Sequence, residues 1–181
     1  MTTRRHWADH EPVSAEPLNG SAVPTPWGWV GRHLRSTATY WLATVRPNGA
    51  PHVMPLLAVW VEGRLYVCMG PGTRKARNLA RDARCVVTVE HEGLDLVIEG
   101  TAVKVRDEDT LRLVAQAYDE IYGWRVTVRD GAFDAAGGAV AGPPPYDVYQ
   151  VAPATAYGFG TDEPLAATRW RFQEPDHRAI E

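Results

Sequence analysis

Three β-rich segments joined by tight turns fill the stretch from residue 39 to residue 69, and they constrain the fold more than any other part of the chain. The segments are 39–45, 51–61 and 64–69. The first ends at Arg-Pro-Asn-Gly, a strong hairpin turn because Asn and Gly tolerate positive φ. The other two are joined by Glu62-Gly63. Hairpin connections of this kind predict a largely antiparallel sheet.

Pro55 lies inside the second segment. Proline has no N–H to donate to a β-ladder, so it is found at sheet edges, at bulges, or where something other than a strand approaches. We therefore expect this segment to lie at such a position. Its apolar run Val53–Val61 is too hydrophobic to leave facing water, which favours a partner surface.

The remaining segments continue the mainly β pattern. Thr73 is a good N-cap for a helix that starts at Arg74, and Asp107 for a second helix that reaches Tyr122. Strands are expected at 85–90, 95–105, 147–152 and 155–160, and residues 123–145 are expected to form a long loop. The order of elements is three strands, a helix, two strands, a helix and two strands. This order predicts a sheet that closes on itself as a small barrel.

Composition narrows the function classes. The formal net charge of −3 over 181 residues predicts no nucleic-acid partner. No apolar run reaches 18 residues, which disfavours a membrane span, and two cysteines without metal spacing suit a reducing cytoplasm. We expect one domain at 31–172, preceded by a partly flexible arm at 1–30 and followed by a tail at 173–181.

A glycine-rich strand exit leads into a helix whose first turn carries cations. Thr73, Arg74 and Lys75 stand where acidic residues are usual, and free N–H groups at a helix N-terminus bind anions. Lys75 and Asn78 are three residues apart and could hold one phosphate. The alternative is a solvated helix face, and the residues alone leave the two interpretations evenly balanced.

Few residues are candidates for catalysis. His52 has no carboxylate at a spacing that suggests a relay, and no histidine pair has metal-ligand spacing. Cys68 lies in an apolar strand and is expected to be a small hydrophobic residue. We therefore predict no catalytic side chain and no metal, so that an enzyme of this sequence needs a cofactor to supply the chemistry.

Residues 38–106 resemble the pyridoxamine-phosphate-oxidase-like family of FMN-binding split barrels, and most closely its actinobacterial branch that uses the deazaflavin coenzyme F420. The resemblance is carried by WLATVRPNGAPHVMPL, GPGTRKARNLARD and LVIEGTAVKV, with TAYGFG and TRWRF near the C-terminus. It implies a mainly β, Greek-key-like split β-barrel, shared across a homodimer with two cofactors at its interface. It further implies that the ring lies along one strand and that the tail phosphate binds at the helix start. The implied ring residues are His52, Val53, Met54, Pro55, Leu56 and Leu57, and the implied tail residues are Thr73, Arg74, Lys75 and Asn78.

The resemblance also implies an activity. It favours an oxidoreductase that uses reduced F420 to transfer hydride to a small electron-poor molecule, such as an activated C=C bond or a quinone. The alternatives are an FMN-dependent oxidase or flavin reductase of the same fold, and a non-catalytic carrier of the cofactor or of haem. Pyridoxamine phosphate oxidases proper have an arginine-rich strand where this chain has HVMPLL, so their own activity is not expected here.

Overall fold

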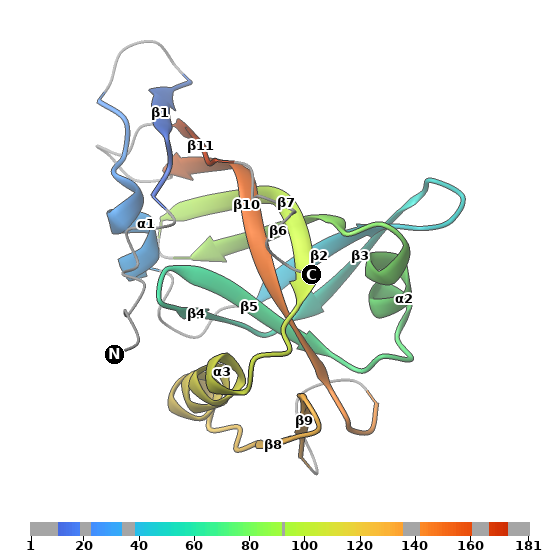
Figure 1. Cartoon of the computed structure of the whole chain (residues 1–181). Coiled ribbons are helices and arrows are strands. Elements are labelled where there is room, and N and C mark those ends of the chain that lie inside the picture. Colours follow the sequence, from blue (N-terminus) through green and yellow to red (C-terminus); the bar gives the residue numbers. More distant parts are fainter. Residues whose placement is uncertain are drawn as a thin grey trace.

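The computed structural model describes residues 11–18, 23–33, 39–91, 93–135, 142–160 and 167–173. Nine strands of the described chain form one sheet, with three helices around it and a separate two-stranded hairpin (Figure 1). In chain order the elements are β1 (Ser14–Pro17), α1 (Trp27–His33), β2 (Tyr40–Val45), β3 (Pro51–Leu56), β4 (Ala58–Val61), β5 (Arg64–Met69), α2 (Arg74–Arg81), β6 (Arg84–His91), β7 (Leu94–Lys104), α3 (Glu108–Tyr122), β8 (Thr127–Arg129), β9 (Ala132–Asp134), β10 (Asp147–Gly160) and β11 (Thr168–Arg171).

The strand pairings trace a ring with one break. All of them are antiparallel: β10 pairs with β7, β7 with β6, β6 with β2, and β2 with β3. The chain then passes Leu57 into β4, which pairs with β5, and β5 returns to β10. The barrel is therefore split at Leu57. This confirms the mainly β, antiparallel fold expected from the sequence.

The break at Leu57 divides what the sequence predicted as one strand over 51–61. The first half pairs with β2 and the second with β5, so the two halves belong to different walls of the barrel. Among the described residues β3 pairs with β2 alone, which makes it an edge strand. The edge explains how Pro55 is accommodated. Conversely, the two strands expected at 147–152 and 155–160 form one strand, β10, with a register shift between Pro153 and Thr155.

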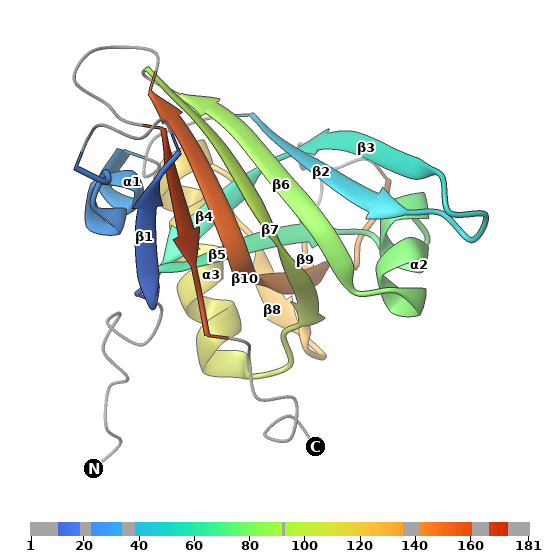
Figure 2. The same ribbon diagram turned by 90° about the horizontal axis from the view of Figure 1, so that it is seen from above.

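Aromatic residues close one end of the barrel. Trp27 of α1 makes edge-to-face contacts with Trp60, Trp170 and Phe172, with ring centroids 6.1, 5.2 and 4.9 Å apart. β1 pairs with β11 beside this cluster, so these parts of the segment 1–30 pack on the barrel. Figure 2 shows this end opposite the β2–β3 hairpin and α2.

A second core lies outside the barrel, between α3 and the strands β4 and β5. The hairpin β8–β9 completes it, with buried Trp124 and Phe133 packed against Tyr118. The sequence predicted a loop over 123–145, and the three-residue strands β8 and β9 are too short to produce a clear periodic pattern. In the described part of the chain no helix is long and apolar enough to span a membrane.

Candidate functional site

Helix α2 begins as the sequence predicted. The hydroxyl of Thr73 accepts a hydrogen bond from the backbone N–H of Ala76 (3.3 Å) and donates one to the carbonyl of Gly70 (2.8 Å). Thr73 is therefore the N-cap, and Arg74 and Lys75 form the first turn, which has no acidic residue. The helix ends at Arg81, and Asp82 is its C-cap.

Asn78 attaches this helix to the barrel. Its side chain is 2% exposed, and its amide nitrogen donates to the hydroxyl of Thr44 on β2 at 2.9 Å. The sequence interpretation placed Asn78 beside Lys75 on one phosphate. The structure places Asn78 against the sheet, where it fixes the helix that carries Lys75, and its part in phosphate binding stays a prediction.

Arg81 fixes the β2–β3 turn over the same helix. Its guanidinium donates to the carbonyls of Val45 (3.0 Å) and Arg46 (2.9 Å). The sequence did not predict this role of Arg81, because a bond to a backbone carbonyl 35 residues away leaves no local pattern. Together with Asn78, Arg81 brings the start of β3 beside the start of α2 (Figures 1 and 2).

Three cations lie around His52 of β3: Arg46 in the turn, and Arg74 and Lys75 on α2. Burial, together with the charges of Arg46, Arg74 and Lys75, lowers the pKa of His52. Its ring nitrogen Nδ1 is buried without a hydrogen-bond partner among the described residues. The group therefore disfavours further positive charge, and an anion would relieve it.

Lys75 is the most constrained of these cations. The side chain is half-buried, and burial lowers its pKa. No ion pair or hydrogen bond of Lys75 occurs within the described part of the chain, whereas the neighbouring Arg84 is paired with Asp82 at 2.7 Å. A half-buried ammonium without a counter-charge costs free energy, so this position fits an anionic ligand better than a solvated helix face.

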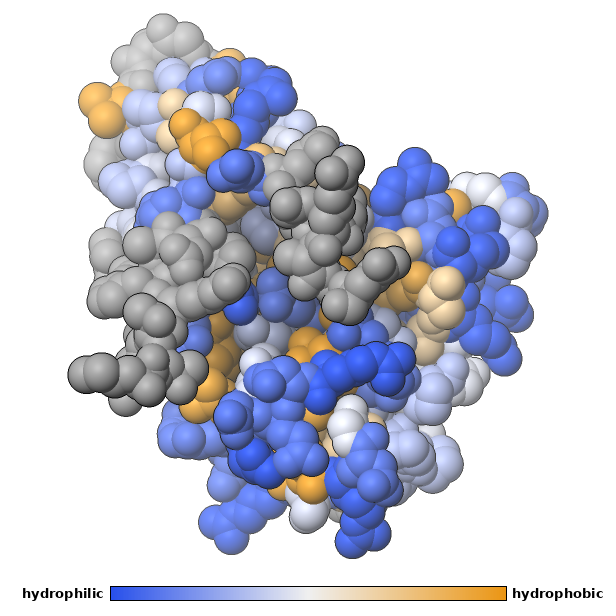
Figure 3. Space-filling view, in the orientation of Figure 1, coloured by the Kyte–Doolittle hydropathy of each residue, from blue (hydrophilic) through white to orange (hydrophobic). Residues whose placement is uncertain are grey.

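β3 presents side chains on both faces beside its free edge. Val53 and Met54 are 50% and 43% exposed, and Pro55 is exposed as well, whereas Leu56 and Leu57 are half-buried. The register with β2 places His52 opposite Thr44 and Met54 opposite Leu42, on the face turned toward the barrel interior and α2. The residues predicted to line the ring and those predicted to bind the tail thus lie in one region. Hydrophobic residues reach the surface among hydrophilic ones over the β2–β3 hairpin and α2 (Figure 3).

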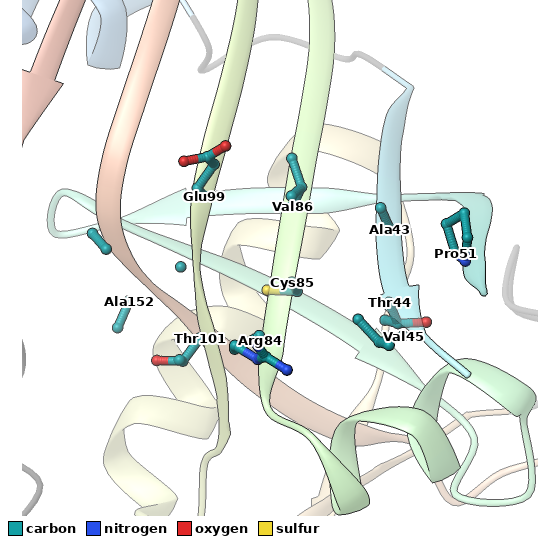
Figure 4. Close-up of a pocket in the computed structure, with 12 residues that line it drawn as sticks. Ala43, Thr44, Val45, Pro51, Arg84, Cys85, Val86, Glu99, Thr101 and Ala152 are labelled. Carbon is teal, nitrogen blue, oxygen red and sulfur yellow. The ribbon is translucent and has the colours of Figure 1, made fainter. Parts of the chain in front are cut away.

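The opposite face of the hairpin opens onto a groove of about 570 Å³. Ala43 of β2, Val86 of β6 and Glu99 of β7 lie side by side in its wall, since Ala43 is opposite Val86 and Val86 is opposite Glu99 (Figure 4). Ala152 and Ala154 of β10 form its far side. Trp41, which is 47% exposed, lies two residues from Ala43 on the same face. The sequence did not reveal this groove, because its lining comes from five strands, β2, β3, β6, β7 and β10.

Neither thiol chemistry nor metal binding is indicated in the described part of the chain. Burial raises the pKa of both Cys68 and Cys85 to about 12, so neither thiol ionises near neutrality. In the described ranges no group of three or more His, Cys, Asp or Glu side chains could hold a metal ion. The site therefore provides positive charge, an exposed strand edge and apolar surface, which suit binding and orientation of a flat anionic molecule.

Comparison with protein families gives a match, and it covers the elements that form this site. The family described as pyridoxamine 5'-phosphate oxidase matches residues 32–160, which is most of the chain and includes β2, β3, α2 and β10. The chain belongs to the pyridoxamine 5'-phosphate oxidase family. No curated protein matches the sequence.

Solved structures of low sequence identity share the family fold. A conserved hypothetical protein of Mycobacterium tuberculosis is 16% identical, with a TM-score of 0.61 over 81% of this chain and 90% of its own. A pyridoxamine 5'-phosphate oxidase-related, FMN binding protein of Nostoc punctiforme is 17% identical, with a TM-score of 0.57 over 86% and 94%. A heme binding protein of Mycobacterium smegmatis is 18% identical, with a TM-score of 0.59 over 81% and 59%. At these identities the likeness establishes the fold.

Proposed function

We propose that this member of the family is an oxidoreductase that uses reduced coenzyme F420 to transfer hydride to a small electron-poor organic molecule, such as an activated C=C bond or a quinone. The observation that carries the proposal is the unpaired cationic group at the start of α2 beside the open edge of β3. Residues 41–56 and 70–82, whose motifs resemble the F420 branch, contain all of these residues.

The side chains have separate roles in this proposal. Lys75, Arg74 and the N–H groups of the first turn of α2 bind the tail phosphate, and Thr73 fixes the shape of that turn. The backbone edge of β3 holds the ring, with Val53, Met54 and Pro55 as apolar neighbours that exclude water. When bound, the deazaflavin supplies two-electron hydride chemistry. No side chain is assigned as proton donor, so the accompanying proton comes from solvent.

The proposal includes a homodimer. The groove beside Ala43 and the exposed Val53 and Trp41 form one apolar face next to the cofactor site. Monomeric proteins seldom expose such a face, whereas a second copy would cover it and complete the pocket. We therefore expect two chains of 20.0 kDa with two cofactor sites along their interface.

Two alternatives keep the same site. FMN would place its phosphate at α2 in the same way, and the Nostoc protein of this fold is named as FMN binding. Haem, bound without turnover, is the second, because the mycobacterial protein of this fold is named as heme binding. His52, whose lowered pKa keeps it neutral at pH 7, would be the candidate iron ligand.

One titration separates these possibilities. The purified protein is titrated with F420, FMN, FAD and haem, and binding is followed by quenching of the seven tryptophans. Tight binding of F420, followed by oxidation of F420H₂ with a quinone or enone acceptor, supports the proposal. Tight FMN binding with weak F420 binding overturns the choice of cofactor. Binding without turnover across the acceptor panel overturns the enzymatic role.

A further inference from the structure

The split of the barrel leaves backbone carbonyls that need partners. β3 ends at Leu56 and β4 starts at Ala58, so the strand ladder is interrupted at Leu57. A buried carbonyl without a hydrogen bond costs free energy, and such groups are almost always paired. Here the partners come from helix α3, more than fifty residues further along the chain.

Two tyrosine hydroxyls bind this break. The hydroxyl of Tyr118 donates to the carbonyl of Leu57 at 3.1 Å, and it lies 3.5 Å from the carbonyl of Tyr66 on β5. The hydroxyl of Tyr122, one helical turn later, donates to the carbonyl of Ala58 at 2.9 Å. The carbonyls of Leu57, the residue at the split, and of Ala58, the first residue of β4, are thus attached to one helix.

The helix that carries them is well fixed. Asp107 caps its start and Gly123, in the left-handed conformation, caps its end. The ring of Tyr118 is fully buried and packs edge-on against Trp124 and Phe133, at centroid distances of 5.4 and 6.1 Å. Burial raises the pKa of Tyr118 well above its ordinary value, so the hydroxyl is protonated and a donor near neutral pH.

We infer that Tyr118 and Tyr122 are positioning residues that hold the end of β3, through the carbonyls of Leu57 and Ala58, in the place where the strand supports the cofactor ring. The inference rests on the proposed function for the identity of what β3 holds. An edge strand has one ladder to hold it, and β3 also loses the support of β4 at the split. Its other end is fixed by Arg81 through the turn.

The chain offers a matched control. Tyr146 belongs to the same aromatic core, is also buried, and donates its hydroxyl to a backbone carbonyl, that of Gly142, at 2.8 Å. Tyr146→Phe removes a bond of the same kind that does not reach the split. All three changes to Phe keep the ring and its packing, so each removes little more than the hydroxyl.

Hydrogen exchange tests the positioning directly on the protein without ligand. Tyr118→Phe and Tyr122→Phe should each speed amide exchange in residues 51–57 about three- to tenfold, the equivalent of one net hydrogen bond, and together by more. Exchange in residues 84–90 of β6 should stay unchanged, and Tyr146→Phe should leave residues 51–57 unchanged. Equal exchange of residues 51–57 in the double variant and the parent would overturn the inference.

Binding then assigns the role to the ring and not to the tail. For whichever ring system the parent binds, affinity is measured with and without the phosphate: FMN against riboflavin, or F420 against its ring with the ribityl chain alone. Tyr118→Phe should weaken both members of the pair about equally, again three- to tenfold. Lys75→Ala should weaken the phosphate-bearing member alone.

The outcomes separate the inference from the proposed function. Unchanged affinities in the tyrosine variants, with a parent that binds well, overturn the positioning role and leave the function standing. A parent that binds neither ring system overturns the proposed function and with it the ring-holding role.

Discussion

The two halves of the apolar run 51–61 have opposite surroundings. In β4 the side chains of Ala58 and Val59 are buried, and α3 with its tyrosines covers the outer wall that β4 shares with β5. In β3, Val53, Met54 and Pro55 are exposed beside unpaired cations. The chain covers the second half, β4, with its own helix and leaves the first half, β3, open. Exposed apolar surface and uncompensated charge both cost free energy, which is why the proposed binding site is placed at the open half.

A long cation in the groove tests whether a second copy covers the open half. Ala43→Arg places a guanidinium among Val53, Val86 and Glu99, and burying it at an interface should cost several kcal/mol of association. The parent should sediment at about twice 20.0 kDa and the variant at 20.0 kDa. Leu113→Arg, at an exposed apolar position on α3, is the control and should stay dimeric. A parent that is monomeric at micromolar concentration and still binds cofactor would refute the dimer.

Gly100→Ala tests the packing of the β7–β10 ladder, where the close approach of the two backbones should make stability the main effect. A Cβ at Gly100 would lie 2.1 Å from the carbonyl oxygen of Ala152, a backbone atom held in the β7–β10 ladder. We expect a loss of about 3 kcal/mol in the free energy of unfolding, measured by denaturant titration. Gly31→Ala in α1 has no atom within 4 Å of the new Cβ and should be neutral or stabilising. Equal free energies of unfolding for the two variants would contradict this prediction and would mean that the backbones of β7 and β10 move apart at Gly100 without cost.

The sequence predicted the fold well where local pattern and turn chemistry agree. The hairpin turn and the two N-caps at Thr73 and Asp107 follow from single residues whose backbone needs are specific. Pro55 allowed an edge, a bulge or a place where something other than a strand approaches, and the structure has the edge. Leu111, Val114 and Tyr118 are buried on one face of α3, at the spacing of an amphipathic helix. These features depend on interactions within a few residues.

The remaining features depend on contacts between distant residues. The split at Leu57 has no sequence signal, because it arises when two halves of one apolar run pair with different strands. Asn78 lies on the same helix face as Lys75 by count, yet its amide reaches Thr44 inside the fold. The sequence predicted two of the cations around His52, Arg74 and Lys75 in the first turn of α2. It did not predict Arg46, because the position of Arg46 depends on the hydrogen bonds that Arg81 makes to the turn.

Lys75→Ala should remove the strongest charge contact of the open half. Losing a hydrogen bond to a charged group should weaken binding of F420 or FMN by about 1.5–3 kcal/mol. Folding should change little, because Lys75 has no ion pair within the described chain to lose. The matched control is Arg77→Ala, an exposed cation in the next turn of the same helix. Equal affinity in the Lys75 variant and the parent would return α2 to the role of a solvated helix.

His52→Gln should change turnover less than tenfold, because the proposed mechanism gives His52 no proton to transfer. A general acid contributes about 10²–10⁴-fold where one operates. The rate of F420H₂ oxidation with a quinone acceptor, measured at saturating cofactor, shows whether His52 acts as a general acid or the proton comes from solvent. A thousandfold loss with normal cofactor binding would make His52 a catalytic residue.

The pH dependence of binding should be the smallest effect, and its sign follows from the charges around His52. Without a ligand, burial and the charges of Arg46, Arg74 and Lys75 hold the pKa of His52 below 6.5, so protonation favours the unfolded chain and stability falls as the pH drops below that value. A bound phosphate offsets those charges and raises the pKa again. Binding therefore takes up protons, and F420 affinity should rise about threefold as the pH falls from 7.5 to 5.5. The part of this slope that belongs to His52 is the difference between the parent and His52→Gln, because any ionisation of the cofactor itself is common to both proteins. The slope in His52→Gln should therefore be smaller; equal slopes in the two proteins would place the anion away from His52.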